Sequence, residues 1–333
     1  MSPKRRFLSS LFGGRRGHRV PVGNPTSIVC VELMMKVGIH FPEAHLDSRS
    51  MAELAAAGHE ILDYDTIMPE FSVQQEAAAL GCEVDWGTED RMPDIKVHPA
   101  KELKDIVIPE NILEKPSLKV VLDAISYLRK NYGDHVAILG KVMGPWTLSY
   151  HLAGTEEFLT WTILNPGKVR RFLEVLKRVP IIFGKAQIQA GADVITLADH
   201  ATGDLVSPEM YREFLLPVHK EIIQKIGSPV ILHVCGNCAD RLDYFAEAGF
   251  DAYHFEWQID AKKAVKAVSG RMSLVGNISN IVLYQGKPED IYKQVRYSIE
   301  AGVNIIAPEC AVPLPTRLQN LKAIVEAAKE PVS

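Results

Sequence analysis

Short runs rich in β-branched and other apolar residues alternate along most of this chain with longer segments whose apolar residues recur at helical spacing. The runs number eight and cover residues 19–23, 64–69, 136–143, 192–198, 229–234, 250–255, 272–276 and 303–307. The helix-like segments between them include 50–62, 117–131, 166–190, 208–226, 239–248, 261–269 and 288–301. A strand followed by a helix, repeated eight times, predicts an α/β fold of the (β/α)8 (TIM) barrel type.

Residues at the ends of the expected helices support these boundaries. Ser207-Pro208 and Asn165-Pro166 each combine an N-cap residue with proline at the first helical position. Helices are expected to end just before the next strand at the Ala-Gly pairs that begin at 190, 248 and 301. An open doubly wound sheet is the alternative. It is disfavoured because no Gly-x-Gly-x-x-Gly turn follows the first strand.

We expect one barrel domain over residues 1–333, with two departures from the regular alternation. A helical extension covers about residues 1–18. The basic start of the chain, with Arg15, Arg16 and Arg19, could contact an acidic partner, but a solvated first helix is the favoured interpretation. The stretch 70–115 is rich in acidic residues and proline and carries little strand signal. We expect it to pass over the barrel mouth.

Composition and charge exclude several classes of function. With 333 residues, of which 47% are hydrophobic, the chain can form one large core. A net charge of -4 gives no general attraction for nucleic acid. The apolar run 7–12 is too short for a signal peptide, and no segment reaches the roughly 18 apolar residues of a membrane span. Five scattered cysteines indicate a reducing compartment, so we expect a cytoplasmic protein without membrane or nucleic-acid partners.

Polar residues follow every expected strand of this chain. In a barrel, catalytic groups come from the carboxyl ends of the strands, so these residues are the candidates for a functional site. They are Asn24, Glu70, Gly144 with Trp146, Asp199 with His200, His233 with Cys235, Glu256, Asn277, and Glu309 with Cys310.

His233 and Cys235 are the most informative of these residues. They lie two apart at a strand end, so both side chains point to the same side, and Cys310 follows another strand. One imidazole and two thiolates suit zinc and leave a fourth position for water, a carboxylate or a substrate. The alternative is a chance pairing of buried residues, which the third residue disfavours. Cys238 completes a Cys-x-x-Cys spacing, but there is no second such pair for a zinc ribbon, and a structural role is expected for it.

The other candidates have structural alternatives. Asp199 either orients a substrate or a ligand, or caps the next helix. Asn277 either donates to a substrate or reflects a close backbone approach at Gly276. His200 and His254 are conceivable general bases, but surface or core roles are favoured for both because no partner is visible.

At these residues, the chain resembles the uroporphyrinogen decarboxylase superfamily. It resembles more closely the zinc-dependent branch of that superfamily, the methylcobamide:coenzyme M methyltransferases. The matching segments lie at 19–26, 76–82, 144–148, 191–199, 207–217, 233–236, 276–278 and 307–310. Most of them imply only the fold, whereas His-x-Cys with a distal Cys is specific to the zinc-dependent branch. In the decarboxylase branch, the resemblance would imply arginines in an N-terminal Arg-Gln-Ala-Gly-Arg type motif that bind the acidic side chains of the substrate. This chain has no arginine between Pro21 and Arg49.

The resemblance implies zinc held by His233, Cys235 and Cys310. It also implies an acidic residue at the free position when substrate is absent, for which Glu256 is the candidate, with Asp199 and Glu309 nearby. The methyl group would come from a methylcobamide carried by a partner protein, because the chain lacks an Asp-x-His-x-x-Gly type corrinoid motif.

In that interpretation, Trp146 and Gly144 either line a corrin-facing mouth or pack the rim. The expected acceptor is a small thiol such as coenzyme M, because a thiophilic metal activates sulfur more than the nitrogen of tetrahydrofolate. No lysine or arginine can be assigned to the sulfonate from the sequence. Transfer to tetrahydrofolate, a metal-free lyase and a non-catalytic module that binds a corrinoid protein are the alternatives.

Overall fold

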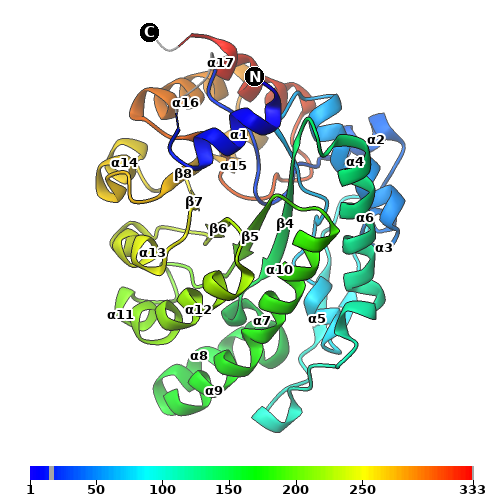
Figure 1. The fold of residues 1–333 in the computed structure, drawn as a ribbon, viewed down its shortest axis with the longest axis vertical. Coiled ribbons are helices and arrows are strands. Elements are labelled where there is room, and N and C mark those ends of the chain that lie inside the picture. The colour runs from blue at the N-terminus through cyan, green and yellow to red at the C-terminus, as the bar shows by residue number, and fades with distance from the viewer. Residues whose placement is uncertain (15–18, 332–333) are drawn as a thin grey trace.

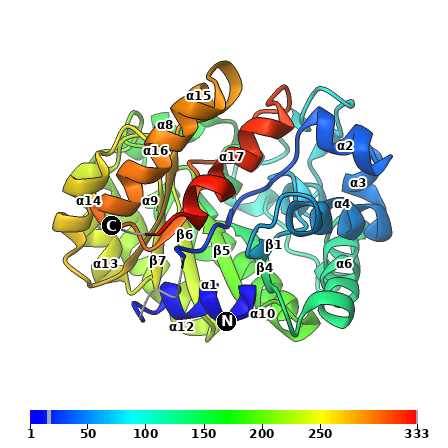
Figure 2. The same cartoon turned by 90° about the horizontal axis from the view of Figure 1, so that it is seen from above.

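A computed structural model describes residues 1–14 and 19–331 of the protein. Its main sheet is parallel and curled, with helices around it (Figures 1 and 2). The strands, in their order across the sheet, are β1 (Thr66–Ile67), β4 (Ala137–Met143), β5 (Val194–Ala198), β6 (Val230–His233), β7 (Ala252–Phe255), β8 (Ser273–Ile278) and β9 (Ile305–Pro308). Each of these seven overlaps one of the expected strands.

The first expected strand, 19–23, is replaced by a single parallel bridge between Val22 and Ile306. Gly23 N–H donates to the Ile306 carbonyl (2.9 Å), and Ile306 N–H donates to that of Pro21 (2.9 Å). On the other side, Asp65 N–H donates to the Val22 carbonyl (2.7 Å). The segment therefore lies between β9 and the start of β1. A longer ladder is prevented because Pro21 has no amide hydrogen to donate.

Most of the expected helices are confirmed. The helices that lie between successive strands, or after the last one, are α6 (Pro116–Tyr132), α9 (Pro166–Leu176), α10 (Arg178–Ala190), α12 (Leu216–Ile226), α13 (Leu242–Ala248), α14 (Ala261–Val268), α16 (Pro288–Ala301) and α17 (Leu318–Lys329). The N-terminal half adds α2 (Val31–Val37), α3 (Glu43–Leu46) and α4 (Ser48–Glu60). The predicted caps are in place: Ser207 Oγ accepts from Met210 N–H, and glycines 191, 249 and 302 have positive φ after α10, α13 and α16.

Several helices differ from the expectation. The segment 166–190 is two helices separated at Lys177, and 208–226 begins with α11 (Pro208–Met210) and a π-helical turn, Tyr211–Leu215. Neither α7 (Pro145–Ala153), α8 (Thr155–Leu164) nor α17 was expected. Helix α7 is buried on nearly every side, so its sequence has no amphipathic period to detect.

The stretch 70–115 contains more regular structure than its sequence suggested. It includes α5 (Gln75–Ala79) and an antiparallel hairpin of two short strands, β2 (Glu83–Asp85) and β3 (Asp94–Val97). The stretch contacts α7, since Ala100 N–H donates to the Leu152 carbonyl (2.8 Å). Its buried residues belong to the same hydrophobic cluster as those of the barrel.

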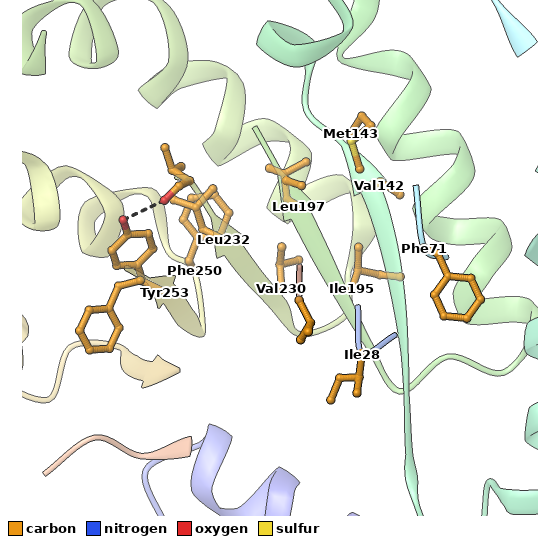
Figure 3. Packing of buried hydrophobic residues seen from close by; sticks show 14 of the residues in the cluster. Ile28, Phe71, Val142, Met143, Ile195, Leu197, Val230, Leu232, Phe250 and Tyr253 are labelled. Carbon is orange, nitrogen blue, oxygen red and sulfur yellow. Dashed lines mark hydrogen bonds between the residues drawn. The ribbon is translucent and has the colours of Figure 1, made fainter. Parts of the chain in front are cut away.

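The hydrophobic core has two parts, one on each face of the curled sheet. The outer part lies between strands and helices and includes Val142, Ile195, Leu197, Val230 and Leu232 (Figure 3). The inner part alternates with it along the strands, as side chains of successive strand residues must. It includes Met68, Ala137, Leu139, Val194, Ile231, Ala252, Val275, Ile305 and Ala307.

Helix α1 (Pro3–Leu11) closes the N-terminal end of this interior. Phe7 and Leu11 are 0% and 1% exposed and pack into the inner cluster. Arg6 pairs with the buried Asp65 just before β1 (2.6 Å). Figure 2 places α1 across one end of the strands, with α15 (Asn280–Gln285) at the other. The expectation of a solvated first helix was therefore wrong, because one face of α1 is apolar and covered.

Of the three arginines considered for contacts with a partner, Arg15 and Arg16 lie outside the described residues. Arg19 forms ion pairs within the chain, with Asp63 (3.3 Å) and with the buried Asp65 (3.2 Å). Among the described residues, no helix combines the length and the apolar character that crossing a membrane requires.

Candidate metal centre

Three side chains that are distant in the sequence meet at the carboxyl ends of the strands. His233 is the last residue of β6, Cys235 follows two residues later, and Cys310 follows β9. The Cys235 sulfur lies 3.3 Å from His233 Nε2 and 3.8 Å from the Cys310 sulfur, and the Cys310 sulfur lies 3.4 Å from the same nitrogen. The predicted convergence of His233, Cys235 and Cys310 is thus present.

These distances can be compared with those that a metal requires. Tetrahedral zinc, with Zn–S of about 2.3 Å and Zn–N of about 2.0 Å, places two sulfurs about 3.8 Å apart and a sulfur and a nitrogen about 3.5 Å apart. The observed separations, 3.8, 3.3 and 3.4 Å, match this triangle closely. The three atoms therefore fit a single ion and leave one tetrahedral position without a protein ligand from this set.

The electrostatics of the three groups also favour a cation. The Cys235 thiol beside it, together with the charge of His233, holds the pKa of Cys310 well below its usual range. Burial opposes a charge on His233, yet the negative Cys310 sulfur raises the pKa of the imidazole overall. The site thus gathers negative charge on sulfur in a place that is largely closed to water, which a bound cation would compensate.

Glu256 is the acidic residue beside these ligands. It follows β7, and its carboxyl group faces the Gly236 N–H and the Cys235 sulfur, while burial raises its pKa. Asn277 in β8 lies behind it: its amide donates to the carbonyls of Ile259 (3.0 Å) and Glu256 (3.4 Å) and accepts from Ser298 (3.0 Å). Asn277 is therefore engaged in holding the loop that carries Glu256, and a direct contact of Asn277 with a substrate stays a prediction.

Asp199 is at the end of β5, but it faces α7 and α12 through a buried network. Its carboxylate accepts from Thr147 N–H (2.8 Å) in the first turn of α7 and from His219 Nε2 (2.9 Å), whose Nδ1 accepts from the Tyr211 hydroxyl (2.9 Å). Asp199 therefore caps α7 rather than the helix that follows it. A Cβ on Gly144 would lie 2.1 Å from Asp199 Cγ, so Gly144 is what allows this close approach.

Trp146 lies wholly inside the rim. It is 0% exposed, its indole N–H donates to the Tyr150 hydroxyl (2.6 Å), and Phe158 packs against its ring at 5.0 Å. Of the two roles considered, the structure places it in the packing of the rim. A direct corrin contact of Trp146 or Gly144 stays a prediction.

Two histidines lie close to the ligands. The His254 ring lies 4.6 Å from that of His233, and its Nε2–H donates to the Pro308 carbonyl (2.7 Å). Burial, and next the charge of His233, lowers its pKa to about 3, so it is a neutral core histidine. His200 is nearer the mouth, and burial and then the charge of His233 also lower its pKa.

Glu309 joins two loops at the rim. Its carboxylate accepts from Trp257 N–H (2.8 Å) after β7 and from Asn280 N–H (2.7 Å) after β8. Since Glu309 precedes Cys310 and Trp257 follows Glu256, this carboxylate fixes the positions of a ligand and its acidic neighbour relative to each other.

Lys141 was not singled out from the sequence. It lies in the middle of β4, is 2% exposed, and donates from Nζ to the Glu70 carbonyl (2.7 Å). The available signal was that it is the one charged residue in the apolar run 136–143.

A parallel α/β fold with a His-Cys-Cys ligand set at its carboxyl end defines a candidate metalloenzyme. The model of the uroporphyrinogen decarboxylase (URO-D) family matches residues 2–331. The chain is 36% identical, over 99% of its length and 90% of the relative's, to a methylated-thiol--coenzyme M methyltransferase of Methanosarcina mazei. It is 34% identical, over 98% of its length and 97% of the relative's, to the methylcobamide:CoM methyltransferase MtaA of Methanosarcina barkeri.

Among solved structures, a methyltransferase from Methanosarcina mazei superposes with a TM-score of 0.95 at 33% identity, covering 98% of each chain. The protein therefore belongs to the uroporphyrinogen decarboxylase family. The two relatives above that are named for methyl transfer to coenzyme M, at 34 to 36% identity, are more similar to it than three relatives named uroporphyrinogen decarboxylases, which match at 26 to 27% identity.

Proposed function

We propose that the protein is a zinc-dependent methyltransferase that moves a methyl group from a methylcobamide, carried by a separate corrinoid protein, to the thiol of coenzyme M or a similar small thiol. The observation that carries the proposal is the triangle of His233 Nε2 and the Cys235 and Cys310 sulfurs, whose sides match those of tetrahedral zinc. Two relatives are named for transfer to coenzyme M, one of them from a methylcobamide, and this supports the corrinoid donor and the thiol acceptor.

The chain's own residues would act by binding and orientation. A bound zinc ion would hold the acceptor sulfur as a thiolate, the form that attacks a methyl group. Strands β6 and β9 fix the three ligands at the end of the barrel interior, and Glu309 holds the loops beside them. The methylcobamide would supply the methyl group, and the chain holds its three ligands at the end of the strands that lies opposite α1.

Glu256 is the proposed fourth ligand in the absence of the acceptor. Its carboxyl group already faces Cys235 and Gly236, and its burial disfavours a free carboxylate there. Two thiolates and a neutral imidazole balance the charge of Zn²⁺. Either a carboxylate or a thiolate at the last position would make the site negative by one, so exchange of one for the other conserves charge.

Two wider features are also proposals. The segment 19–24 is hydrogen-bonded to β9 on one side and to Asp65 on the other, and it would take the place of the eighth strand of a (β/α)8 barrel. A cytoplasmic location stays a prediction.

The test measures zinc content and methyl transfer from free methylcobalamin to coenzyme M, homocysteine and tetrahydrofolate side by side. Zinc binds to four-ligand sites with a free energy of about 10–16 kcal/mol. Loss of one ligand in Cys235→Ala should therefore weaken zinc binding by roughly 10²- to 10³-fold and abolish methyl transfer. Cys82→Ala, the same change at a buried cysteine in the 70–115 stretch, should retain both.

Activity of a zinc-free protein on a carboxylated substrate would instead favour the metal-free lyase. Tight binding of a corrinoid protein with no methylation of any acceptor would indicate a non-catalytic module. Transfer to tetrahydrofolate but to neither thiol would contradict the proposed acceptor.

A further inference from the structure

Lys141 is a buried cation in the barrel interior, one level below the candidate metal centre. Ala137 and Leu139 of β4 face the inner cluster, so Lys141, two residues further on, faces it too. Its partner in the neighbouring strand is Thr196, whose own partner is Ile231 of β6. His233 follows Ile231 by two residues, which is about 6.6 Å along a strand.

The backbone around Lys141 is built to hold this side chain in place. From α10, Gln187 Oε1 accepts from Lys141 N–H (2.9 Å) and Gln187 Nε2 donates to the Lys141 carbonyl (2.6 Å). A Cβ on Gly140 would lie 2.3 Å from Gln187 Oε1, so only glycine admits the amide. An outer helix therefore fixes the strand at the residue whose side chain enters the interior.

The ammonium group of Lys141 is poorly satisfied in this position. It has three N–H donors, and the bond to the Glu70 carbonyl uses one of them. Among the described residues, no carboxylate oxygen lies within ion-pair distance of Nζ. Both carboxyl oxygens of Glu70, Glu76 Oε2 and Thr196 Oγ are also buried without a partner. Buried polar groups in native proteins are normally bonded, so this cluster points to a polar ligand.

The charges of the cluster select the sign of that ligand. Burial, and then the neighbouring Glu76, raises the pKa of Glu70 well above its usual range, and burial raises the pKa of Glu76 to about 7. The two acids therefore do not both ionise near neutral pH. Burial lowers the pKa of Lys141, while the charges of Glu70, Glu76 and Cys310 oppose that shift. An ammonium group whose one hydrogen-bond partner is a backbone carbonyl favours an anion.

We propose that Lys141 binds the anionic tail of the acceptor thiol while the thiol sulfur lies at the metal centre. This inference rests on the proposed function and narrows its substrate class to short thiols that end in a sulfonate or carboxylate. The Lys141 ammonium would donate to the anion, and the neutral Glu70 carboxyl group would donate a second hydrogen bond. Lys141 is then a residue that determines specificity, and a neutral thiol gains nothing from it.

The first experiment compares KM and kcat for coenzyme M, 3-mercaptopropionate and the neutral 2-mercaptoethanol. Because a charge-assisted bond is lost, Lys141→Met should raise the KM for both anionic thiols about 10- to 100-fold. The KM for 2-mercaptoethanol should change less than about threefold. The matched control is Lys168→Met: Lys168 is also buried, donating to the Lys101 carbonyl (2.6 Å) over the Trp161 ring on the outer layer. That variant should leave all three values unchanged.

A second readout does not depend on turnover. Calorimetry should detect binding of ethanesulfonate, which has the anionic tail but no thiol, to the wild type and not to Lys141→Met. Lys141→Gln keeps a donor group, the side-chain amide, without the charge and should fall between them. It also replaces Lys141→Met in both experiments if that variant does not fold.

The outcomes separate the inference from the proposed function. Equal losses for anionic and neutral thiols, or an unchanged KM for coenzyme M, would overturn the role of Lys141 while methyl transfer by the wild type still stands. If the wild type methylates no thiol but binds ethanesulfonate through Lys141, the anion site stands and the proposed function fails.

Discussion

Phe7 should be among the residues on which the stability of the fold depends most, although it lies in the nine-residue helix α1 near the chain start. Its ring is 0% exposed and fills the interior beneath the inner strand residues, such as Leu139 and Val194. Phe7→Ala would remove the ring and leave a cavity, because the surrounding strands are hydrogen-bonded to one another and cannot close around the space. The lost contacts are on the apolar face of α1, opposite the exposed Arg5.

The expected cost follows from the burial. Truncation of a fully buried phenylalanine costs about 3–5 kcal/mol. Unfolding entropy of about 2.1 cal/mol/K per residue gives roughly 0.7 kcal/mol/K for a chain of 333 residues. The melting temperature should therefore fall by about 4–7 °C.

Urea unfolding followed by circular dichroism at 25 °C measures the loss directly. Arg5→Ala, on the exposed side of the same helix, is the matched control and should change the free energy of unfolding by less than about 0.5 kcal/mol. Zinc content should remain unchanged in Phe7→Ala, because the ligands are at the other end of the strands. A loss below about 1 kcal/mol would refute the reasoning that α1 seals the interior.

Two further predictions concern buried polar groups. His45 is buried and stacks on Phe41 at 4.0 Å, and burial, then the charge of Lys141, lowers its pKa to about 3. The His45 imidazole therefore stays neutral in the folded protein, whereas in the unfolded chain it takes up a proton below about pH 6.5. Because of this difference, the free energy of unfolding should fall as the pH falls, by about 2 kcal/mol at pH 5. Urea titrations at pH 7.5 and 5 should show that His45→Phe lacks this loss, and equal losses in the two proteins would contradict it. Asp199→Asn keeps an oxygen that accepts from Thr147 N–H, so it should lower the free energy of unfolding by only about 1–2 kcal/mol. The KM for coenzyme M should stay within about threefold of the wild-type value. A large loss of kcat at unchanged stability would indicate a catalytic role instead.

Strand positions and helix ends could be predicted because their signals are local. The buried runs that became β4 to β9 are short and apolar, most of them with β-branched residues, and Gly191, Gly249 and Gly302 end helices at positive φ, where other residues are strained. The three ligands were found for the same reason. Each lies at the end of such a run or just after it, and the carboxyl ends of parallel strands meet at one end of the sheet.

The missed features depend on tertiary contacts that the sequence does not encode locally. Helix α7 is apolar all round because it is enclosed, whereas the first expected strand is limited to one bridge because Pro21 has no amide hydrogen to donate. Phe7 and Leu11 are four residues apart, as one helical face requires, but nothing nearby in sequence reveals that this face covers a barrel. Lys141 was overlooked because a lysine in an apolar strand gains meaning only when His233 is known to lie above it.

The closure of one end by α1 has a consequence for the order of events. Because Phe7 and Leu11 fill the far end of the interior, both reactants of the proposed reaction would, as far as the described residues show, enter at the carboxyl ends of the strands. The small thiol would then take the deeper place and would have to arrive before the bulky methyl donor covers the opening. The methylated product would depart after that partner withdraws, so the proposed reaction implies a fixed sequence of arrival and departure.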